Sequence, residues 1–192
     1  MSMMLHMKAE TAVHHAQTES LLRERLFNKQ LSQRCYCDVL NVFYTAYSSL
    51  ESAIANFPLT AQLLKDRSKI ELLKKDLIYL RSASSVKVHY LSNPDLPRVA
   101  NEAAALGVIY VMEGSTLGGK IIISYLKKYD WMDVDLCGNF FSNYGDSRGR
   151  MWNEFGEIVN SFSSANQHAA THVVSGAKLA FDYIYSLLMQ IR

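Results

Sequence analysis

The sequence predicts an all-α fold, a single domain built as an array of several helices. Apolar residues recur at steps of three and four through most of the chain, a spacing that gives a helix one apolar face. The three prolines, Pro58, Pro94 and Pro97, stand where this pattern breaks. No stretch combines alternating apolar residues with the turn pairs of a β-hairpin, so no sheet is expected.

Each helix follows from a stretch of this apolar periodicity between breaks. In the second, for example, Leu40, Phe43, Tyr47 and Leu50 lie along one stripe. Such patterns set helix ends only to within a few residues. They predict seven or eight helices within residues 5–27, 32–56, 60–91, 98–128, 138–161 and 166–190.

Length and composition agree with one globular domain covering residues 1–192. The chain has 192 residues, of which 49% are hydrophobic and 20% charged, which excludes a disordered or low-complexity protein. Its 20 basic and 18 acidic residues leave a net charge of +2, which argues against a nucleic-acid partner. No run of about 20 consecutive apolar residues predicts a membrane span, and the N-terminus has no secretory pattern. We therefore expect a cytoplasmic protein.

The cysteines support this location. Cys35, Cys37 and Cys137 are an odd number, which does not make a disulfide framework. We expect three buried free thiols in a reducing compartment.

Residues 106–120 contain four of the nine glycines inside an otherwise helical pattern: Gly107, Gly114, Gly118 and Gly119. Each glycine costs a helix interior roughly 0.5–1 kcal/mol relative to alanine, so the cluster needs a compensating reason. Two reasons remain open: tight packing between helices, or a planar ligand resting on a face without side chains. A phosphate-binding loop does not fit, because Gly119-Lys120 is followed by Ile121 rather than Ser or Thr.

His15 and Glu19 form the second unusual feature. They are four residues apart, on one face of the first expected helix, with Lys8 and Thr11 on the preceding turns. Imidazole is a common ligand for iron, and a carboxylate one turn away can orient the ring. A surface histidine is the alternative interpretation.

Together these features resemble the heme oxygenase family. The spacing of Lys8, Thr11, His15 and Glu19 is similar to the proximal-helix signature of these enzymes, Lys-x-x-Thr-x-x-x-His-x-x-x-Glu. Tyr110-Val-Met-Glu-Gly114-Ser-Thr-Leu-Gly118-Gly119 resembles the distal helix of the bacterial, biliverdin-producing branch associated with bacteriophytochromes. Phe141-Ser-Asn-Tyr144-Gly145, followed by Trp152 and Phe155, is also similar to that branch. The resemblance covers nearly the whole chain and implies heme held between the first helix and a kinked glycine-rich helix.

The resemblance implies roles for single residues on the proximal side. His15 matches the axial ligand of the heme iron, Glu19 its supporting partner, and Lys8 a residue that contacts a heme propionate. Phe181 matches an aromatic residue that packs on the porphyrin edge. Arg148 and Arg150 are both candidates for the second propionate, and the spacing does not choose between them.

On the distal side, Gly114, Gly118 and Gly119 match the glycines that lie over the heme. Animal members carry an aspartate after the first of these glycines, where it organises water that delivers protons. Ser115 stands at that position in this sequence, and bacterial members of the family also lack the aspartate. Ser115 leaves the proton route open.

The implied activity is opening of heme by O2 to biliverdin, CO and ferrous iron, with heme as both cofactor and substrate. A ferredoxin or an NAD(P)H-dependent reductase would supply electrons, so an electron-donor protein is an expected partner. The chain would be a monomer or a weak dimer. A non-catalytic heme carrier or sensor on the same fold is the alternative.

Two further features carry no expected function. His168 and His172 are four apart, but no second Glu-x-x-His pair supports a metal site, so we expect surface histidines. The charged run Lys65-Asp-Arg67-Ser-Lys69 is expected to be a solvated loop that contributes at most to a docking surface.

Overall fold

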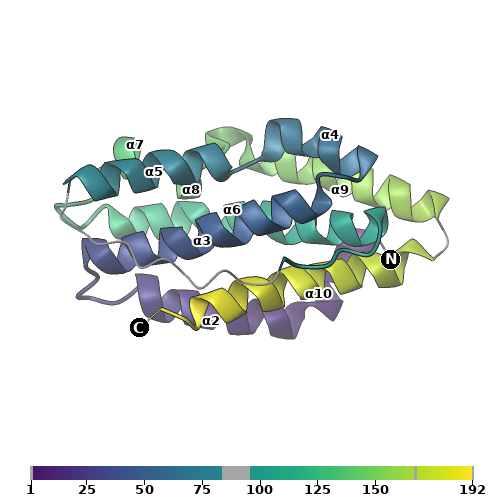
Figure 1. Cartoon of the computed structure of the whole chain (residues 1–192), viewed down its shortest axis with the longest axis horizontal. Coiled ribbons are helices and arrows are strands. Elements are labelled where there is room, and N and C mark those ends of the chain that lie inside the picture. Colours follow the sequence, from purple (N-terminus) through teal and green to yellow (C-terminus); the bar gives the residue numbers. More distant parts are fainter. Residues whose placement is uncertain (1, 84–95, 167, 192) are drawn as a thin grey trace.

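The computed structural model describes residues 2–83, 96–166 and 168–191. Those residues form helices and no strand, which confirms the predicted all-α class. In the view of Figure 1, α3 and α6 run through the middle, with α4 and α5 above them and α2 and α10 below. The elements in order are α1 (Met3–Glu10), α2 (Ala12–Leu26), α3 (Gln33–Ile54), α4 (Pro58–Arg67), α5 (Ile70–Ala83), α6 (Glu102–Leu126), α7 (Val134–Cys137), α8 (Asn139–Ser142), a 3-10 turn η1 (Gly145–Ser147), α9 (Arg148–Ala165) and α10 (Ala169–Leu188).

The predicted helix starts at residues 32, 60 and 98 lie within four residues of the observed ones, which local signals set. α3 starts after Ser32, whose hydroxyl accepts a hydrogen bond from the Cys35 backbone N–H at 3.2 Å. Pro58 opens α4, where a proline costs no helical hydrogen bond. Asn101 caps α6 by accepting from the Ala104 N–H at 3.0 Å. Residues 84–91 of the predicted 60–91 stretch lie outside the described residues.

The prediction of one helix over residues 5–27 is wrong. The chain breaks at Thr11, with φ −107° and ψ 6°, and continues as α2. The Thr11 hydroxyl donates to the Met7 carbonyl at 2.8 Å, which gives the buried side chain a local partner at the break. Lys8 and His15 therefore lie on two separate helices, so their spacing does not hold them on one face.

The predicted helix over residues 138–161 is also wrong in its first third. Tyr144 adopts a left-handed conformation with φ 64°, and Gly145 follows with φ 49°, which no α-helix continues through. The single turn α8 precedes this break and α9 follows it. Buried Asp76 of α5 accepts from the backbone N–H groups of Asn139 and Phe140, at 2.9 and 2.8 Å, and so caps α8.

Helices α6 and α10 cross at a contact that only glycines permit. A Cβ on Gly107 would overlap the Val173 carbonyl, and one on Gly176 would overlap the Ala104 carbonyl. For Gly107 the packing interpretation of the glycine cluster is therefore confirmed. By length and composition α6 could cross a membrane, but 67% of that apolar window is buried inside the molecule, as befits a core helix.

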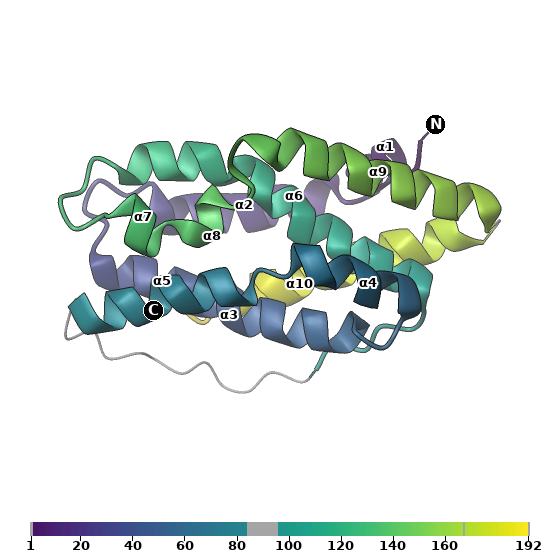
Figure 2. The same cartoon turned by 90° about the horizontal axis from the view of Figure 1, so that it is seen from above.

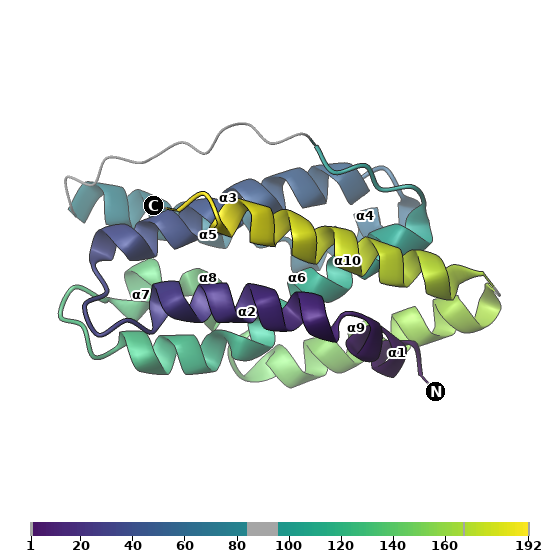
Figure 3. The same ribbon diagram turned by 90° about the horizontal axis from the view of Figure 1, so that it is seen from below.

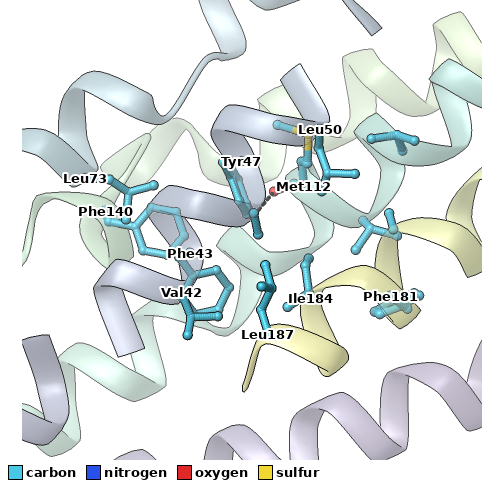
Figure 4. Packing of buried hydrophobic residues seen from close by; sticks show 14 of the residues in the cluster. Val42, Phe43, Tyr47, Leu50, Leu73, Met112, Phe140, Phe181, Ile184 and Leu187 are labelled. Carbon is cyan, nitrogen blue, oxygen red and sulfur yellow. Dashed lines mark hydrogen bonds between the residues drawn. The ribbon is translucent and has the colours of Figure 1, made fainter. Parts of the chain in front are cut away.

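Around this crossing, side chains from α3, α6 and α10 form the core, shown in Figure 4. Tyr47 of α3 packs edge to face with Phe43 and with Phe140, and the rings of Phe43 and Phe140 pack at a tilt. The Tyr47 hydroxyl also donates to the Met112 carbonyl of α6 at 3.3 Å, drawn as a dashed line. Cys37 and Cys137 are buried free thiols as expected, whereas Cys35 faces outward on the first turn of α3 and is exposed, so that part of the cysteine prediction is wrong.

Candidate functional site

Residues at the two ends of α2 contact an interior turn and the last turn of α6. Near the start of α2, a side-chain hydrogen bond joins Thr11 to Tyr110. Burial raises the pKa of the Tyr110 hydroxyl. Beyond the other end, the rings of Phe27 and Tyr125 lie 4.6 Å apart. Thr11 precedes Phe27 in the chain and Tyr110 precedes Tyr125, so α2 and this part of α6 run parallel. Figure 3 shows α2 with α10 beside it, and Figure 2 shows that α6 changes direction along its length.

Between these contacts α2 presents the His15 imidazole. Its side chain is 62% exposed, and its Nδ1 lies 3.6 Å from Glu19 Oε2. This distance is too long for a direct hydrogen bond and suits a bridging water. Phe181 of α10 packs edge-on against the ring at 5.8 Å between centroids. Among the described residues no hydrogen bond or ion pair to Nε2 is observed, so this nitrogen is available to a ligand.

The corresponding stretch of α6 presents backbone and apolar side chains. Gly118 is exposed, and a Cβ built on it would meet nothing within 4 Å. Leu117 and Ile121 beside it are 43% and 61% exposed, which is unusual for large apolar side chains. Gly114, one turn earlier, would place a Cβ 3.6 Å from the Trp152 ring. This exposed apolar face without a side chain at its centre fits a flat apolar ligand.

Gly119 faces elsewhere. A Cβ on Gly119 would overlap the carbonyl of Phe141 in α8, so this glycine permits close packing between α6 and α8. The two explanations that the sequence leaves open therefore both hold, for different residues. Gly107 and Gly119 serve helix packing, and Gly118 leaves its face open.

Ser115 turns its hydroxyl toward the core. It donates to the Met112 carbonyl at 2.8 Å and lies 2.6 Å from the hydroxyl of Tyr47 in α3. Burial holds the pKa of Tyr47 well above its usual range, so this hydroxyl keeps its proton at neutral pH. At the position where animal relatives carry an aspartate, this chain has the neutral hydroxyl of Ser115, which lies beside the neutral hydroxyl of Tyr47.

The basic residues expected at the propionates do not gather at His15. Lys8 is exposed on the last turn of α1. Arg148 donates to the carbonyls of Phe141 and Asn143, both at 3.2 Å, and so caps the end of α8. Arg150 pairs along its own helix with Glu154 at 2.6 Å. In the parts of the chain that the structure describes, neither arginine contacts α2.

The charged run at residues 65–69 is not a solvated loop, and this correction reveals the main feature that sequence reasoning missed. Lys65 and Asp66 are exposed, but Arg67 is only 6% exposed and Lys69 is fully buried. Both cations bind the buried carboxylate of Glu113, Lys69 at 2.6 Å and Arg67 through Nη1. One signal could have found this pair: Glu113 is a lone carboxylate directly after the apolar run 106–112, and a buried charge requires a partner.

The histidines of α10 behave as predicted. His168 and His172 are exposed, and the described residues contain no group of three or more His, Cys, Asp or Glu side chains that could hold a metal ion. The exposed His15 imidazole on α2 and the open face at Gly118 on α6 fit heme.

The sequence matches the model of the heme oxygenase family over residues 1–190. The chain belongs to the heme oxygenase family. A search of curated proteins by sequence finds no match.

Solved heme oxygenases share the fold at low sequence identity. The NO- and CO-bound heme oxygenase from Neisseria meningitidis superimposes with a TM-score of 0.78 at 21% identity, covering 99% of this chain and 92% of that one. Heme oxygenase 2 from Chlamydomonas reinhardtii, solved without heme, gives 0.78 at 16% identity, with coverage of 100% and 98%. The heme oxygenase from Leptospira interrogans gives 0.74 at 16% identity and covers both chains completely.

Proposed function

We propose that this heme oxygenase family member opens heme with O2 to give biliverdin, CO and ferrous iron. Heme is both substrate and cofactor, and a ferredoxin or an NAD(P)H-dependent reductase supplies the electrons. Two observations carry the proposal: an available imidazole nitrogen, His15 Nε2, on α2, and an open glycine face at Gly118 on a parallel helix. The distal motif around Glu113-Gly114-Ser115 supports the bacteriophytochrome-associated branch.

On the α2 side, His15 holds the substrate. When bound, heme supplies the iron that activates O2 and the ring that is opened. We assign Nε2 as the protein ligand because Nδ1 faces the Glu19 carboxylate. A carboxylate beside Nδ1 fixes the tautomer that carries its proton there, and it makes Nε2 a better donor. Phe181 packs against the imidazole ring and limits its rotation.

On the α6 side, the bare backbone at Gly118 would leave room for the flat ring against the helix and so would favour one meso carbon as the site of opening. Leu117 and Ile121 provide apolar surface for the porphyrin and exclude water from it. Gly114 contributes to the same face beside Trp152. The role of Gly119 over the heme stays a prediction, since its missing side chain is already explained by packing on Phe141.

Ser115 and Tyr47 together offer a route for protons in place of the absent aspartate. Their hydroxyls lie 2.6 Å apart and either can donate to the other, so a proton passes between them only in a concerted shift that leaves both hydroxyls neutral. Lys8 is the basic residue free to meet a propionate, while Arg148 and Arg150 would first have to leave their present partners. A single domain over residues 1–192, a cytoplasmic location and a monomer or weak dimer complete the proposal.

A turnover assay tests the proposed activity. The purified protein is loaded with hemin, given a reductase–ferredoxin system under air with catalase present, and followed by visible spectroscopy. Loss of the Soret band with rising bile-pigment absorbance is expected. A Soret band that forms and then persists would instead identify a heme carrier or sensor, and failure to bind hemin would contradict both functions.

A further inference from the structure

The Glu113 carboxylate is the centre of a buried ionic cluster outside the residues assigned so far. Glu113 is 1% exposed, and its two oxygens receive three donors. Lys69 Nζ and the Tyr144 hydroxyl donate to Oε1 at 2.6 and 2.9 Å, and Arg67 Nη1 donates to Oε2. Charge-assisted hydrogen bonds of this kind are the strongest that side chains make.

Both cations that bind Glu113 also bind other groups. Lys69 Nζ uses its three protons on Glu113, the Arg67 carbonyl at 2.6 Å and the Tyr144 hydroxyl at 2.9 Å. Arg67 Nη1 also donates to the carbonyl of Met151 at 3.1 Å, in the first turn of α9. The cluster therefore links the α4–α5 junction and the α8–α9 segment to one point on α6.

That point adjoins the glycine face. Glu113 directly precedes Gly114, and Met151 directly precedes Trp152, whose ring lies 3.6 Å from the position of a Gly114 Cβ. The Trp152 ring also packs against Tyr110 at 5.5 Å. Tyr144, which donates to Glu113, holds the left-handed turn from which α9 begins. Trp152 is thus held beside the candidate site from two directions, through Arg67 and through Tyr144.

We propose that Glu113 is a positioning residue for the substrate: through Arg67 and Tyr144 it fixes α9 and the Trp152 ring against the glycine face of α6. The inference rests on the proposed function, because the face it shapes is the one that would receive heme. Without the carboxylate, the turn at Tyr144 loses its buried acceptor and Trp152 loses its fixed place beside Gly114. The substrate would then sit in more than one orientation.

A purely structural role is the competing explanation, and Glu51 provides a matched control. Glu51 is also buried, 6% exposed, and it binds the same loop by accepting from the Ser68 hydroxyl at 2.6 Å and the Lys69 N–H at 3.1 Å. It lies on α3 and has no hydrogen bond to α6 or α9. Glu51→Gln should therefore lower stability without altering the site.

The experiment compares Glu113→Gln with Glu51→Gln and the unmodified chain. In a Trp131→Phe background, Trp152 is the remaining one of the two tryptophans and reports its own surroundings by fluorescence without heme. Glu113→Gln should shift Trp152 emission to longer wavelength, weaken hemin binding about tenfold and change the ratio of bile-pigment isomers. Glu51→Gln should leave all three unchanged.

Equal hemin affinity and isomer ratio in Glu113→Gln and Glu51→Gln would overturn the inference. If Glu113→Gln fails to fold, Tyr144→Phe removes one donor without leaving an unpaired charge, and it should produce smaller shifts of the same sign; no shift would count against the proposal. Failure of the unmodified chain to bind hemin would instead contradict the proposed function, while Trp152 emission still reports whether Glu113 holds α9.

Discussion

At the scale of single residues, the imidazole of His15 makes the most specific claim. It differs from the other histidines described in having a carboxylate near Nδ1, an aromatic edge against its ring and an available Nε2. The sequence predicts the pair His15 and Glu19 from their spacing alone, because both lie on α2. It does not predict Phe181 as a neighbour except through resemblance, since α10 is distant in sequence.

His15→Ala should remove the protein nitrogen ligand and leave the fold intact, since the side chain is 62% exposed. We expect the Soret maximum of the ferric heme complex to change, and added imidazole to restore it by replacing the missing ligand. His172→Ala, an exposed histidine on α10, serves as the control and should leave the spectrum unchanged. An unaltered Soret band in His15→Ala would contradict the assignment.

Gly118→Val tests the open face directly. Nothing in the protein lies within 4 Å of a Cβ at this position, so the apoprotein should keep its melting temperature within a few degrees. The added side chain would occupy the space above the ligand, so turnover should fall or the oxidised meso carbon should change. Product chromatography measures both, and wild-type turnover with the wild-type isomer pattern would count against this role.

At the scale of the elements, neighbouring glycines of α6 should respond in opposite ways to the same change. Gly118→Ala should stabilise the protein by about 0.5–1 kcal/mol, because alanine is the better helix former. Gly119→Ala should destabilise it by about 1–3 kcal/mol, because its Cβ would overlap the Phe141 carbonyl. For a chain of this size, about 1 kcal/mol corresponds to a shift in melting temperature of 2–4 °C. Equal melting temperatures for the two variants would contradict the packing assigned to Gly119.

The elements that the sequence predicts least well are those decided by contacts between distant segments. The apolar pattern continues through Thr11, yet the chain breaks there while Thr11 bonds to Met7 and to Tyr110 of α6. Likewise, Asp76 caps α8 across 63 residues of sequence, which no local signal reveals. Helices bounded by their own capping residues, such as α3 after Ser32, follow from sequence more closely.

At the scale of the whole molecule, the all-α class and the paired features on α2 and α6 are predictable because they depend on periodicity and spacing. The buried cluster is not, since residues 65–69 look like any solvated charged loop until Glu113 is placed against them. Burial is a tertiary property, and a buried pair that loses one partner costs about 3–5 kcal/mol. The sequence signal for the cluster is Glu113 itself, because a carboxylate directly after an apolar run requires cationic partners when it is buried.

The buried carboxylate of Glu51, next to the cluster, predicts how stability depends on pH. Burial raises the pKa of Glu51 above its ordinary value of 4.5, with the hydrogen bond from Ser68 opposing the rise. A raised pKa means that the folded protein binds a proton on Glu51 more readily than the unfolded chain does. Its stabilising contribution is therefore present below about pH 4.5 and is lost as the pH rises through the folded pKa.

Glu51→Gln cannot ionise, so the stability of the unmodified chain relative to this variant should fall as the pH rises from 4.5. Melting temperatures of both proteins measured from pH 4 to pH 7 would show this trend, and effects of other groups cancel in the difference. A relative stability that rises with pH would contradict the raised pKa.

We propose that heme binds between His15 and the Gly118 face and that its ring is opened there. Mass spectrometry tests this on pigment extracted after the hemin complex has turned over under O2 with the reductase–ferredoxin system, with His15→Ala run in parallel. We expect an iron-free, ring-opened tetrapyrrole from the unmodified protein and intact heme from the variant. Intact heme from both proteins would contradict it.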